Sequence, residues 1–384
     1  MEKISKLKKI FNLLLIFGIP CSYAEISPET ITIEKLKRAH PHRIYLTDLA
    51  LNHVIDGRIH ILDGADNFKY LGLIGTGMMG LTALSNDRSE MLVATTYYSK
   101  GTRGEKSEYL EAYDTNDLSL KMEIKIPPRH AQALPYVGTM RSSIDDRYVY
   151  IQNATPATSI SIIDKKEKKF VHEVMTPGCW IILPSASNDK KFSTMCGDGT
   201  FLTVTHNSEG VPTSQERSDK LFDADKDPLF VQAENIKDVF FFVSFLGDVY
   251  EIDLSGPTAS LNSKWSLLED DDLTEKWRPS GYQLLAISKT SNRMYVAMHK
   301  NGREGSHKFP GDEIWSYDIK SQSRIGRSPG NNTIAMTLTK EQTPHLYAYD
   351  GINLQIHKYE TTPNLKHVAM SDLIGEFAGL IQTH

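Results

Sequence analysis

A short repeating pattern limits what this 384-residue chain can fold into more than any other feature. A polar turn, followed by a short apolar strand rich in β-branched and aromatic residues, recurs at intervals of about 43 to 59 residues. The seven predicted strands begin at Arg43, Met91, Tyr148, Phe192, Val239, Met294 and Leu346. Several are followed by a second strand that ends in an acidic residue at a turn, as in residues 59–63 and 160–164. Self-similarity at a fixed spacing is typical of repeat architectures.

The repeat predicts an all-β fold, a seven-bladed β-propeller that forms one domain over residues 25–384. Dividing the length of the predicted domain, residues 25–384, by seven gives about 51 residues per unit. This is enough for four short strands and their turns. A closed ring of such units protects the sheet edges, whereas a β-sandwich would need fewer strands or two domains. Helical signal is confined to residues 269–276 and the segment after Met370, and the polar stretch 208–225 is interpreted as a loop between blades.

The N-terminus has the three parts of a secretion signal: four lysines, an apolar run over residues 10–19, and Ser22-Tyr23-Ala24 as a cleavage pattern. We expect residues 1–24 to be removed and the protein to reach the periplasm. No later stretch approaches the roughly 20 apolar residues that span a bilayer, so membrane insertion is not expected. Removal of residues 1–24 takes the net charge from −5 to −8, and such an acidic balance argues against nucleic acid as a partner.

Two cysteines remain after cleavage, because Cys21 is lost with the signal. Cys179 and Cys196 lie at equal distances from a turn centred on Ser187 and Asn188, so they should face each other across an antiparallel hairpin. In an oxidising compartment this predicts a disulfide, worth roughly 3 kcal/mol in the entropic model. The alternative is a pair of buried free thiols.

The residues alone indicate no catalytic set and no metal site. The chain has no Cys-x-x-Cys-His, His-Glu-x-x-His, phosphate-binding lysine loop or Gly-x-Ser-x-Gly. Its thirteen histidines are scattered, and His40, His42 and His130 are interpreted as solvated loop residues rather than ligands. The glycine-rich segment 75–80 resembles a dinucleotide loop, but in a propeller it is better explained as a turn-rich connection.

A family resemblance takes the interpretation further. The chain resembles the large (heavy) subunit of the quinoprotein amine dehydrogenases, and the likeness covers essentially the whole mature chain. It is carried by residues 95–98 (TTYY), 102–107 (TRGEKS), 111–114 (EAYD), 152–160 (QNATPATSI), 178–180 (GCW), 196–199 (CGDG), 265–268 (WSLL), 277–282 (WRPSGY), 299–310 and 313–315 (EIW). The aromatic amine dehydrogenase branch is the closer likeness, through residues 153–159 and 307–310, and the methylamine dehydrogenase heavy chain is related.

The resemblance implies a function for an assembly rather than for this chain by itself. It implies a small, cysteine-rich light subunit as partner in a two-plus-two heterotetramer. That light subunit carries tryptophan tryptophylquinone. The complex oxidises primary amines to aldehyde and ammonia, and we expect the amines to be aromatic. Electrons pass to a blue copper protein similar to azurin or amicyanin. No cofactor and no catalytic residue is expected in this chain, whose four tryptophans are interpreted as structural.

The resemblance also suggests roles for a few residues. Met78 falls where the family places a phenylalanine beside the substrate channel, a departure that would alter which amines enter. Met78 could equally pack in a blade loop. Trp277, Pro279 and Tyr282 are predicted either to contact the partner subunit or to pack at a blade edge. The rival function is a stand-alone secreted propeller that binds a ligand or partner without enzyme activity.

Overall fold

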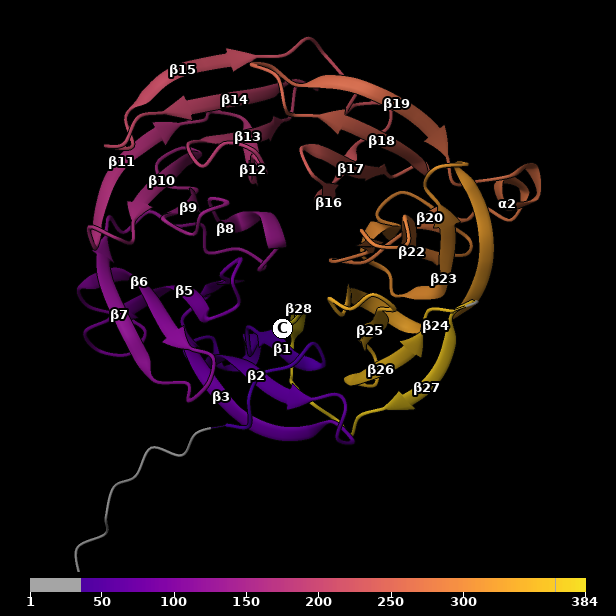
Figure 1. The fold of residues 1–384 in the computed structure, drawn as a ribbon, viewed down its shortest axis with the longest axis horizontal. Coiled ribbons are helices and arrows are strands. Elements are labelled where there is room, and N and C mark those ends of the chain that lie inside the picture. Colours follow the sequence, from indigo (N-terminus) through magenta and orange to yellow (C-terminus); the bar gives the residue numbers. More distant parts are fainter. Residues whose placement is uncertain (1–35, 363) are drawn as a thin grey trace, which may run out of the picture. The chain divides into compact units, whose positions relative to one another are not determined.

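The computed structural model describes residues 36–362 and 364–384, which fall in one compact unit built almost entirely of strands. The predicted signal peptide, including Cys21, lies outside the described residues, as do residues 25–35 of the predicted domain. The sheets surround a common centre like the blades of a propeller (Figure 1), which confirms the predicted all-β propeller class. Strands predicted from the repeat are the second strand of each four-stranded sheet, for example β9 (Tyr148–Asn153).

Five sheets have four antiparallel strands each, ordered from the centre of the ring outward. They are β28 (Ala378–Thr383), β1 (Arg43–Asp48), β2 (Gly57–Asp63) and β3 (Lys69–Gly77); β4 (Leu81–Leu84), β5 (Glu90–Tyr98), β6 (Lys106–Asp114) and β7 (Leu120–Ile126); and β8 (Met140–Ser142), β9, β10 (Ser159–Asp164) and β11 (Lys169–Met175). The other two are β12 (Cys179–Pro184), β13 (Lys191–Cys196), β14 (Phe201–His206) and β15 (Pro212–Arg217); and β16 (Leu229–Ile236), β17 (Val239–Ser244), β18 (Asp248–Asp253) and β19 (Ser260–Ser266).

The prediction of seven separate four-stranded blades is wrong, because the remaining strands form one continuous sheet of eight. It contains β20 (Arg278–Pro279), β21 (Leu285–Ser288), β22 (Arg293–His299), β23 (Gly311–Asp318), β24 (Ser323–Leu338), β25 (His345–Asp350), β26 (Gln355–Glu360) and β27 (Lys366–Met370). The 16-residue β24 pairs with β23 through its first part and with β25 through its last. Asn331 and Asn332, with φ of 50° and 54°, bend β24 without ending it.

Short helices and one polar strand complete the chain. The helical signal at residues 269–276 is confirmed by α2 (Asp270–Thr274), with its capping box between Glu269 and Asp272. Three 3-10 turns are η1 (Leu51–His53), η2 (Val137–Thr139) and η3 (Ser306–Lys308). Two expectations are wrong. The segment after Met370 leads into β28 rather than a helix, and the polar stretch 208–225 contains β15, whose outward position at a sheet edge explains its polar sequence.

Apolar side chains fill the spaces between neighbouring sheets. One cluster joins the β4–β7 sheet to the next sheet through Leu92, Leu110 and Ile151. The cluster that contains Ile44 and Tyr347 packs the first strands of the chain against the last strands of the eight-stranded sheet. Each sheet therefore buries both faces, which accounts for strands such as β1 and β9 in which every residue is buried.

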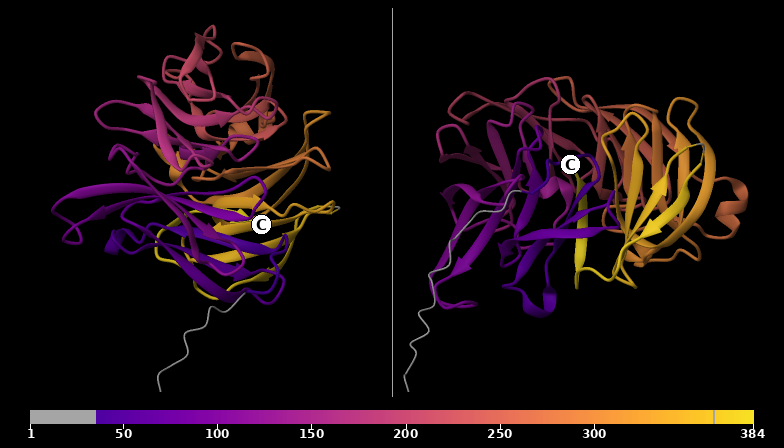
Figure 2. Two further views of the ribbon diagram at one scale, coloured as in Figure 1. Left: turned by 60° about the vertical axis from the view of Figure 1, so that its left-hand side comes forward. Right: turned by 60° about the horizontal axis from the view of Figure 1, so that its bottom comes forward.

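The two ends of the described chain close the ring. β28 pairs antiparallel with β1, so the last strand occupies the innermost place in the first sheet (Figures 1 and 2). The Asp48 carboxylate, at the end of β1, accepts hydrogen bonds from the backbone N–H groups of Glu376 at 2.7 Å and Phe377 at 2.9 Å, just before β28. It also accepts one from Ala50 N–H at 2.8 Å. A single buried carboxylate thus ties together segments more than 300 residues apart.

The predicted disulfide is present between Cys179 and Cys196. The two residues are direct partners in the antiparallel pairing of β12 with β13, as their equal distances from the turn predict. Both are buried, so the bond fastens the inner hairpin of its blade.

Removal of the disulfide should lower thermal stability. Replacing both cysteines by serine frees the unfolded chain from a crosslink that spans 17 residues, and we expect a loss of roughly 3 kcal/mol. Thermal unfolding followed by circular dichroism, with and without a reductant, measures this. The reductant should lower the midpoint of the wild-type protein and leave that of the variant unchanged. Equal midpoints for the two proteins under oxidising conditions would contradict the prediction.

Asp48→Asn should destabilise the closed ring in a pH-dependent way. Burial would raise the pKa of Asp48, but hydrogen bonds from His60 and the three backbone N–H groups lower it to about 2. The folded pKa lies below the unfolded one, so the stabilisation is full above about pH 4 and is lost as the pH falls towards 2. We expect a cost of about 2 kcal/mol at pH 7 that shrinks in acid, measured by urea unfolding. Asp56→Asn, an exposed change in the same connection, should have no such effect.

Candidate functional site

The innermost strands begin on one face of the ring and end on the other. Residues just before or at the starts of β8, β21 and β28 meet in a small hollow that includes Pro135, Tyr282 and Gly379. The ends of β4, β8, β12, β21, β24 and β28 instead surround a separate, larger cavity. We call the first side of the ring the start face and the second side the end face.

The start face carries two of the residues that sequence reasoning selected. Met78 lies in the turn between β3 and β4, is half-buried, and donates its backbone N–H to Thr96 O at 3.4 Å. The turn is tightly supported, since a Cβ on Gly77, which has φ of 62°, would lie 2.3 Å from Thr95 Oγ1. Tyr282 is half-buried in the hollow described above. The structure therefore brings Met78 and Tyr282 to the same side of the ring without placing them in contact.

Trp277 and Pro279 are buried, so within the described chain their side chains pack rather than offer surface to a partner. The Trp277 ring lies 5.1 Å from that of Trp315, between centroids, and the Arg327 guanidinium covers both rings. Trp277 Nε1 donates to Glu275 at 2.8 Å. Of the two alternatives given for these residues, these contacts of Trp277 correspond to packing at a blade edge. Contact with a partner subunit stays a prediction for Tyr282.

The tryptophans do not fit a quinone that an amine could reach. Trp315 is fully buried and Trp277 is 3% exposed, and no described cavity opens onto them. Trp265 is also buried, and its Nε1 donates to Glu251 at 3.0 Å. Trp180, in β12, is half-buried and packs against a different apolar cluster from the other three. The arrangement agrees with a structural role, and we derive no redox step within this chain.

Large apolar side chains gather on the start face. Among the described residues, eighteen such side chains are exposed, and ten of them lie in connections or strand ends on this face. They are Leu51, Ile55, Tyr97, Met175, Leu246, Leu273, Phe309, Ile352, Met370 and Leu373. By the same criterion three of the eighteen lie on the end face, namely Ile144, Val211 and Leu120 at the first residue of β7, and the other five are on outermost strands. Among the described residues, the start face is therefore the more apolar of the two faces.

A buried ion pair supports this face beneath the Met78 turn. His130 Nδ1 lies 2.7 Å from Glu108 Oε2, and both side chains are fully buried. Lys106 Nζ contacts the other carboxylate oxygen at 2.6 Å, and Thr96, which receives the Met78 N–H, also donates to it at 3.4 Å. Burial would raise the pKa of Glu108, but hydrogen bonding to His130 and the charge of its ring keep it low.

The expectation that His130 is a solvated loop residue is therefore wrong. His130 forms an isolated bridge with Asn153, which places it between two sheets rather than on the surface. Sequence reasoning missed Glu108 altogether, because one carboxylate in an otherwise ordinary strand, β6, gives no signal of its distant partner.

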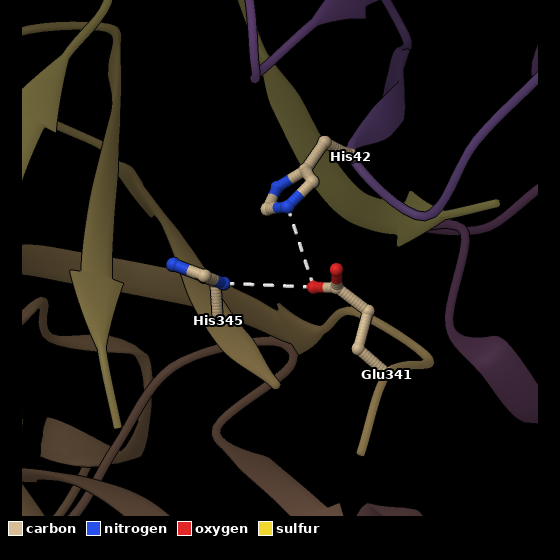
Figure 3. A group of neighbouring side chains, drawn as sticks. All are labelled: His42, Glu341 and His345. Carbon is tan, nitrogen blue, oxygen red and sulfur yellow. Dashed lines mark ion pairs between the residues drawn. The ribbon is translucent and has the colours of Figure 1, made fainter. Parts of the chain in front are cut away.

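One described group of side chains could hold a metal ion, and it involves a histidine that was interpreted as solvated. His42 Nε2 lies 3.3 Å and His345 Nδ1 3.5 Å from the same Glu341 oxygen, as Figure 3 shows. The three ligand atoms lie within 4.8 Å of one another. His42 Nδ1 is also 2.7 Å from the Tyr347 hydroxyl. All three side chains are half-buried, so His42 is not a freely solvated residue.

The same group has a simpler electrostatic explanation. Burial lowers the pKa of His42, although the Glu341 charge opposes this. Burial would raise the pKa of Glu341, but the Thr339 hydroxyl and the His42 charge lower it. The Glu341 carboxylate accepts a hydrogen bond from the Thr339 hydroxyl at 2.8 Å and lies beside both rings, so it links the segment before β1 to the β24–β25 connection. Its place near the end face separates it from Met78 and Tyr282.

The described residues include no helix long and apolar enough to cross a membrane.

Comparison with known proteins identifies relatives along most of the chain. A family model described as methylamine dehydrogenase heavy chain matches residues 40–381. The methylamine dehydrogenase heavy chain of Methylophilus methylotrophus is 26% identical over 342 residues, which cover 88% of this chain and 82% of that one. That of Methylobacillus flagellatus is 24% identical over 325 residues, covering 83% and 79%. A putative 6-phosphogluconolactonase from Bacteroides uniformis has a similar fold, with a TM-score of 0.62, 10% identity, and coverage of 90% and 100%.

Removal of the buried carboxylate should destabilise the start face. Glu108→Ala leaves His130 and Lys106 without their shared partner, and we expect a loss of about 3 to 5 kcal/mol. Glu105→Ala, which removes an exposed carboxylate just before the same strand, should change stability by less than about 0.5 kcal/mol. Urea unfolding of both variants measures the difference. Equal stabilities would show that the pair does not support the fold.

Proposed function

The chain belongs to the methylamine dehydrogenase heavy chain family, and from this we propose that it is the large subunit of a periplasmic amine dehydrogenase. The observation that carries the proposal is the family match over residues 40–381, together with relatives aligned along most of their own length. In this role the chain builds and shapes an assembly whose chemistry takes place on another subunit.

The partner we propose is a small, cysteine-rich light subunit that carries tryptophan tryptophylquinone, in a two-plus-two heterotetramer. Three of the four tryptophans are buried, and the half-buried Trp180 packs against a different apolar cluster, which supports that division of labour. We place the light subunit on the start face, where exposed apolar side chains concentrate and where Met78 and Tyr282 lie. Burial of such side chains is the main driving force of stable association.

The reaction we propose is oxidation of a primary amine to aldehyde and ammonia, followed by electron transfer to a blue copper protein. The contribution of this chain is a wall of the substrate entrance. Met78 is half-buried in a turn held by Thr96 and Gly77, so its flexible thioether would form part of that wall from a fixed backbone. The sequence likeness at residues 153–159 and 307–310 supports aromatic amines as the preferred substrates. The relatives named above are methylamine dehydrogenase heavy chains, so small amines belong in the same assay.

The experiment is native purification from the periplasm, mass analysis of any bound chain, and assay of amine-dependent dye reduction. We expect a small quinone-bearing partner and activity that is greater with an aromatic amine than with methylamine. A lone, inactive protein would overturn the proposal and favour a stand-alone binding propeller. Activity with methylamine alone would remove only the aromatic preference.

Paired charge substitutions test the proposed docking face in the same purification. Leu51→Glu with Leu373→Glu places two carboxylates on the start face, and this variant should lose the small chain and the activity. Ile144→Glu with Val211→Glu makes the same change at exposed residues of the end face and should retain both. Unchanged thermal midpoints for the isolated large chains show that folding is intact. If the Ile144/Val211 variant lost the small chain and the Leu51/Leu373 variant kept it, the light subunit would dock on the end face, and the proposed docking face would be wrong.

A further inference from the structure

The end face contains a cavity of about 980 Å³ where the innermost strands finish. Its wall is formed by the ends of β4, β8, β12, β16, β21, β24 and β28 and the connections that follow several of them. The apolar side chains exposed on the start face are not part of it. Nothing in the proposed dehydrogenase function uses this cavity.

The cavity is lined by more cationic side chains than carboxylates, although the chain as a whole carries a net charge of −5. Five lysines and arginines and two glutamates contribute to the lining. Arg88 comes from the turn after β4 and Arg141 from β8, while Lys289 and Lys340 follow β21 and β24. Four cations from different strands therefore converge on one space, with Glu234 of β16 as the acidic residue among them.

These four cations have no carboxylate partner among the described residues within ion-pair distance. Arg88 Nε is buried and has no hydrogen-bond partner within the described structure. An unpartnered buried guanidinium nitrogen costs free energy, because it has given up water without gaining a protein acceptor. Arg43 Nε is also buried without a partner, but Arg43 Nη1 donates to Thr115 O at 2.8 Å. Arg147 pairs with Asp164 at 2.7 Å.

The cations also repel one another. Burial lowers the pKa of Arg88 to about 10, and the neighbouring Arg141 guanidinium contributes. Burial lowers the pKa of Arg141. Burial raises the pKa of Glu234, against the attraction of Arg141 and Lys289, and the two carboxylates of the lining are outnumbered by its five cations.

We propose that the end-face cavity is a binding site for a small multivalent oxyanion, a molecule that carries several phosphate or carboxylate oxygens. The guanidinium groups of Arg88 and Arg141 can each donate two parallel N–H hydrogen bonds to a pair of such oxygens. The ammonium groups of Lys289 and Lys340 add positive charge but do not orient the ligand. The cavity volume lies within the range of small-molecule sites and exceeds that of a single phosphate ion. A bound anion would supply the acceptor that Arg88 lacks and would remove the repulsion between the cations.

The test uses the purified full chain, with pyrophosphate and citrate as separate probes. Inorganic phosphate, which has a single phosphate group, is the comparison. Binding is measured by isothermal titration calorimetry at pH 7 and low ionic strength, and the thermal midpoint is recorded with and without each probe. Pyrophosphate and citrate distinguish a phosphate-bearing from a carboxylate-bearing ligand. We expect saturable binding of at least one of them, a raised midpoint, and weaker binding of phosphate.

Two substitutions of opposite charge should act in opposite directions. Arg141→Gln should weaken binding of the probe by about tenfold or more. Glu234→Gln should strengthen it, because it removes the carboxylate that competes with the anion. Arg141→Gln should also raise the thermal midpoint without a ligand, whereas loss of a purely structural residue would lower it. Lys226→Gln, on an exposed residue that pairs only with Asp223 in the described structure, is the matched control and should change neither value.

The proposal is overturned if none of the three anions binds the wild-type chain at millimolar concentration. It is equally overturned if Arg141→Gln binds like the wild type, or if Glu234→Gln weakens binding. Should Arg141→Gln fail to fold, Lys289→Gln decides the question, since its exposed side chain can be changed without disturbing the core. Loss of binding in Lys289→Gln supports the site, and unchanged binding rejects it. None of these outcomes depends on amine oxidation.

Discussion

The pairing of β28 with β1 is the interaction on which the rest of the structure depends. Without it, the sheet that begins with β1 would present an unpaired inner edge, and the eight-stranded sheet would lose its neighbour. An open ring of sheets exposes strand edges that invite pairing with other chains. Asp48 strengthens the closure, because its carboxylate satisfies backbone N–H groups beside the start of β28. Both ends of the described chain thus contribute to one sheet, and the two faces of the ring become fixed relative to each other.

Closure also explains why the two faces can differ in chemistry. The innermost strands run from the start face to the end face, so their first residues and their last residues belong to separate surfaces. The connections on the start face carry exposed leucine, methionine and aromatic side chains, while the strand ends on the opposite face carry arginine and lysine. A rigid sheet core lets loops on either face change without altering the other. The apolar face suits a protein partner and the cationic cavity suits a small charged ligand.

Much of the fold could be predicted from local sequence, because strands such as β1, β9 and β17 are apolar runs after polar turns. The hairpin disulfide followed from symmetry about a turn. The continuous β24 could not be predicted in this way. Asn331 and Asn332 are turn-forming residues, and only tertiary pairing on both sides keeps the strand unbroken. The polar β15 was missed because an outward edge strand lacks the apolar alternation that marks a strand.

The site was harder to predict than the fold, since its contacts join residues far apart in sequence. Met78 could be selected by likeness to a family, but Glu108 and His130 met only when two sheets packed together. The same holds for His42, which contacts Glu341 from about 300 residues away in the sequence, whereas His345 is only four residues from Glu341. Long-range pairs of charged groups leave no periodic signal, whereas buried apolar strands do.

The cations of the end-face cavity converge on one space with few carboxylates among them, unlike the paired arginines of the eight-stranded sheet. Arg324 and Arg327 contact acidic side chains and also cover tryptophan rings, so their charges stabilise the fold. Arg88 and Arg141 make no comparable contact, and their mutual repulsion opposes folding. Features that reduce stability persist in proteins where function requires them. Folding alone gives no reason to bring these arginines together, because an outward-facing polar residue would serve the β4–β5 turn equally well. Binding of an anion supplies that reason, since it converts the same repulsion into affinity.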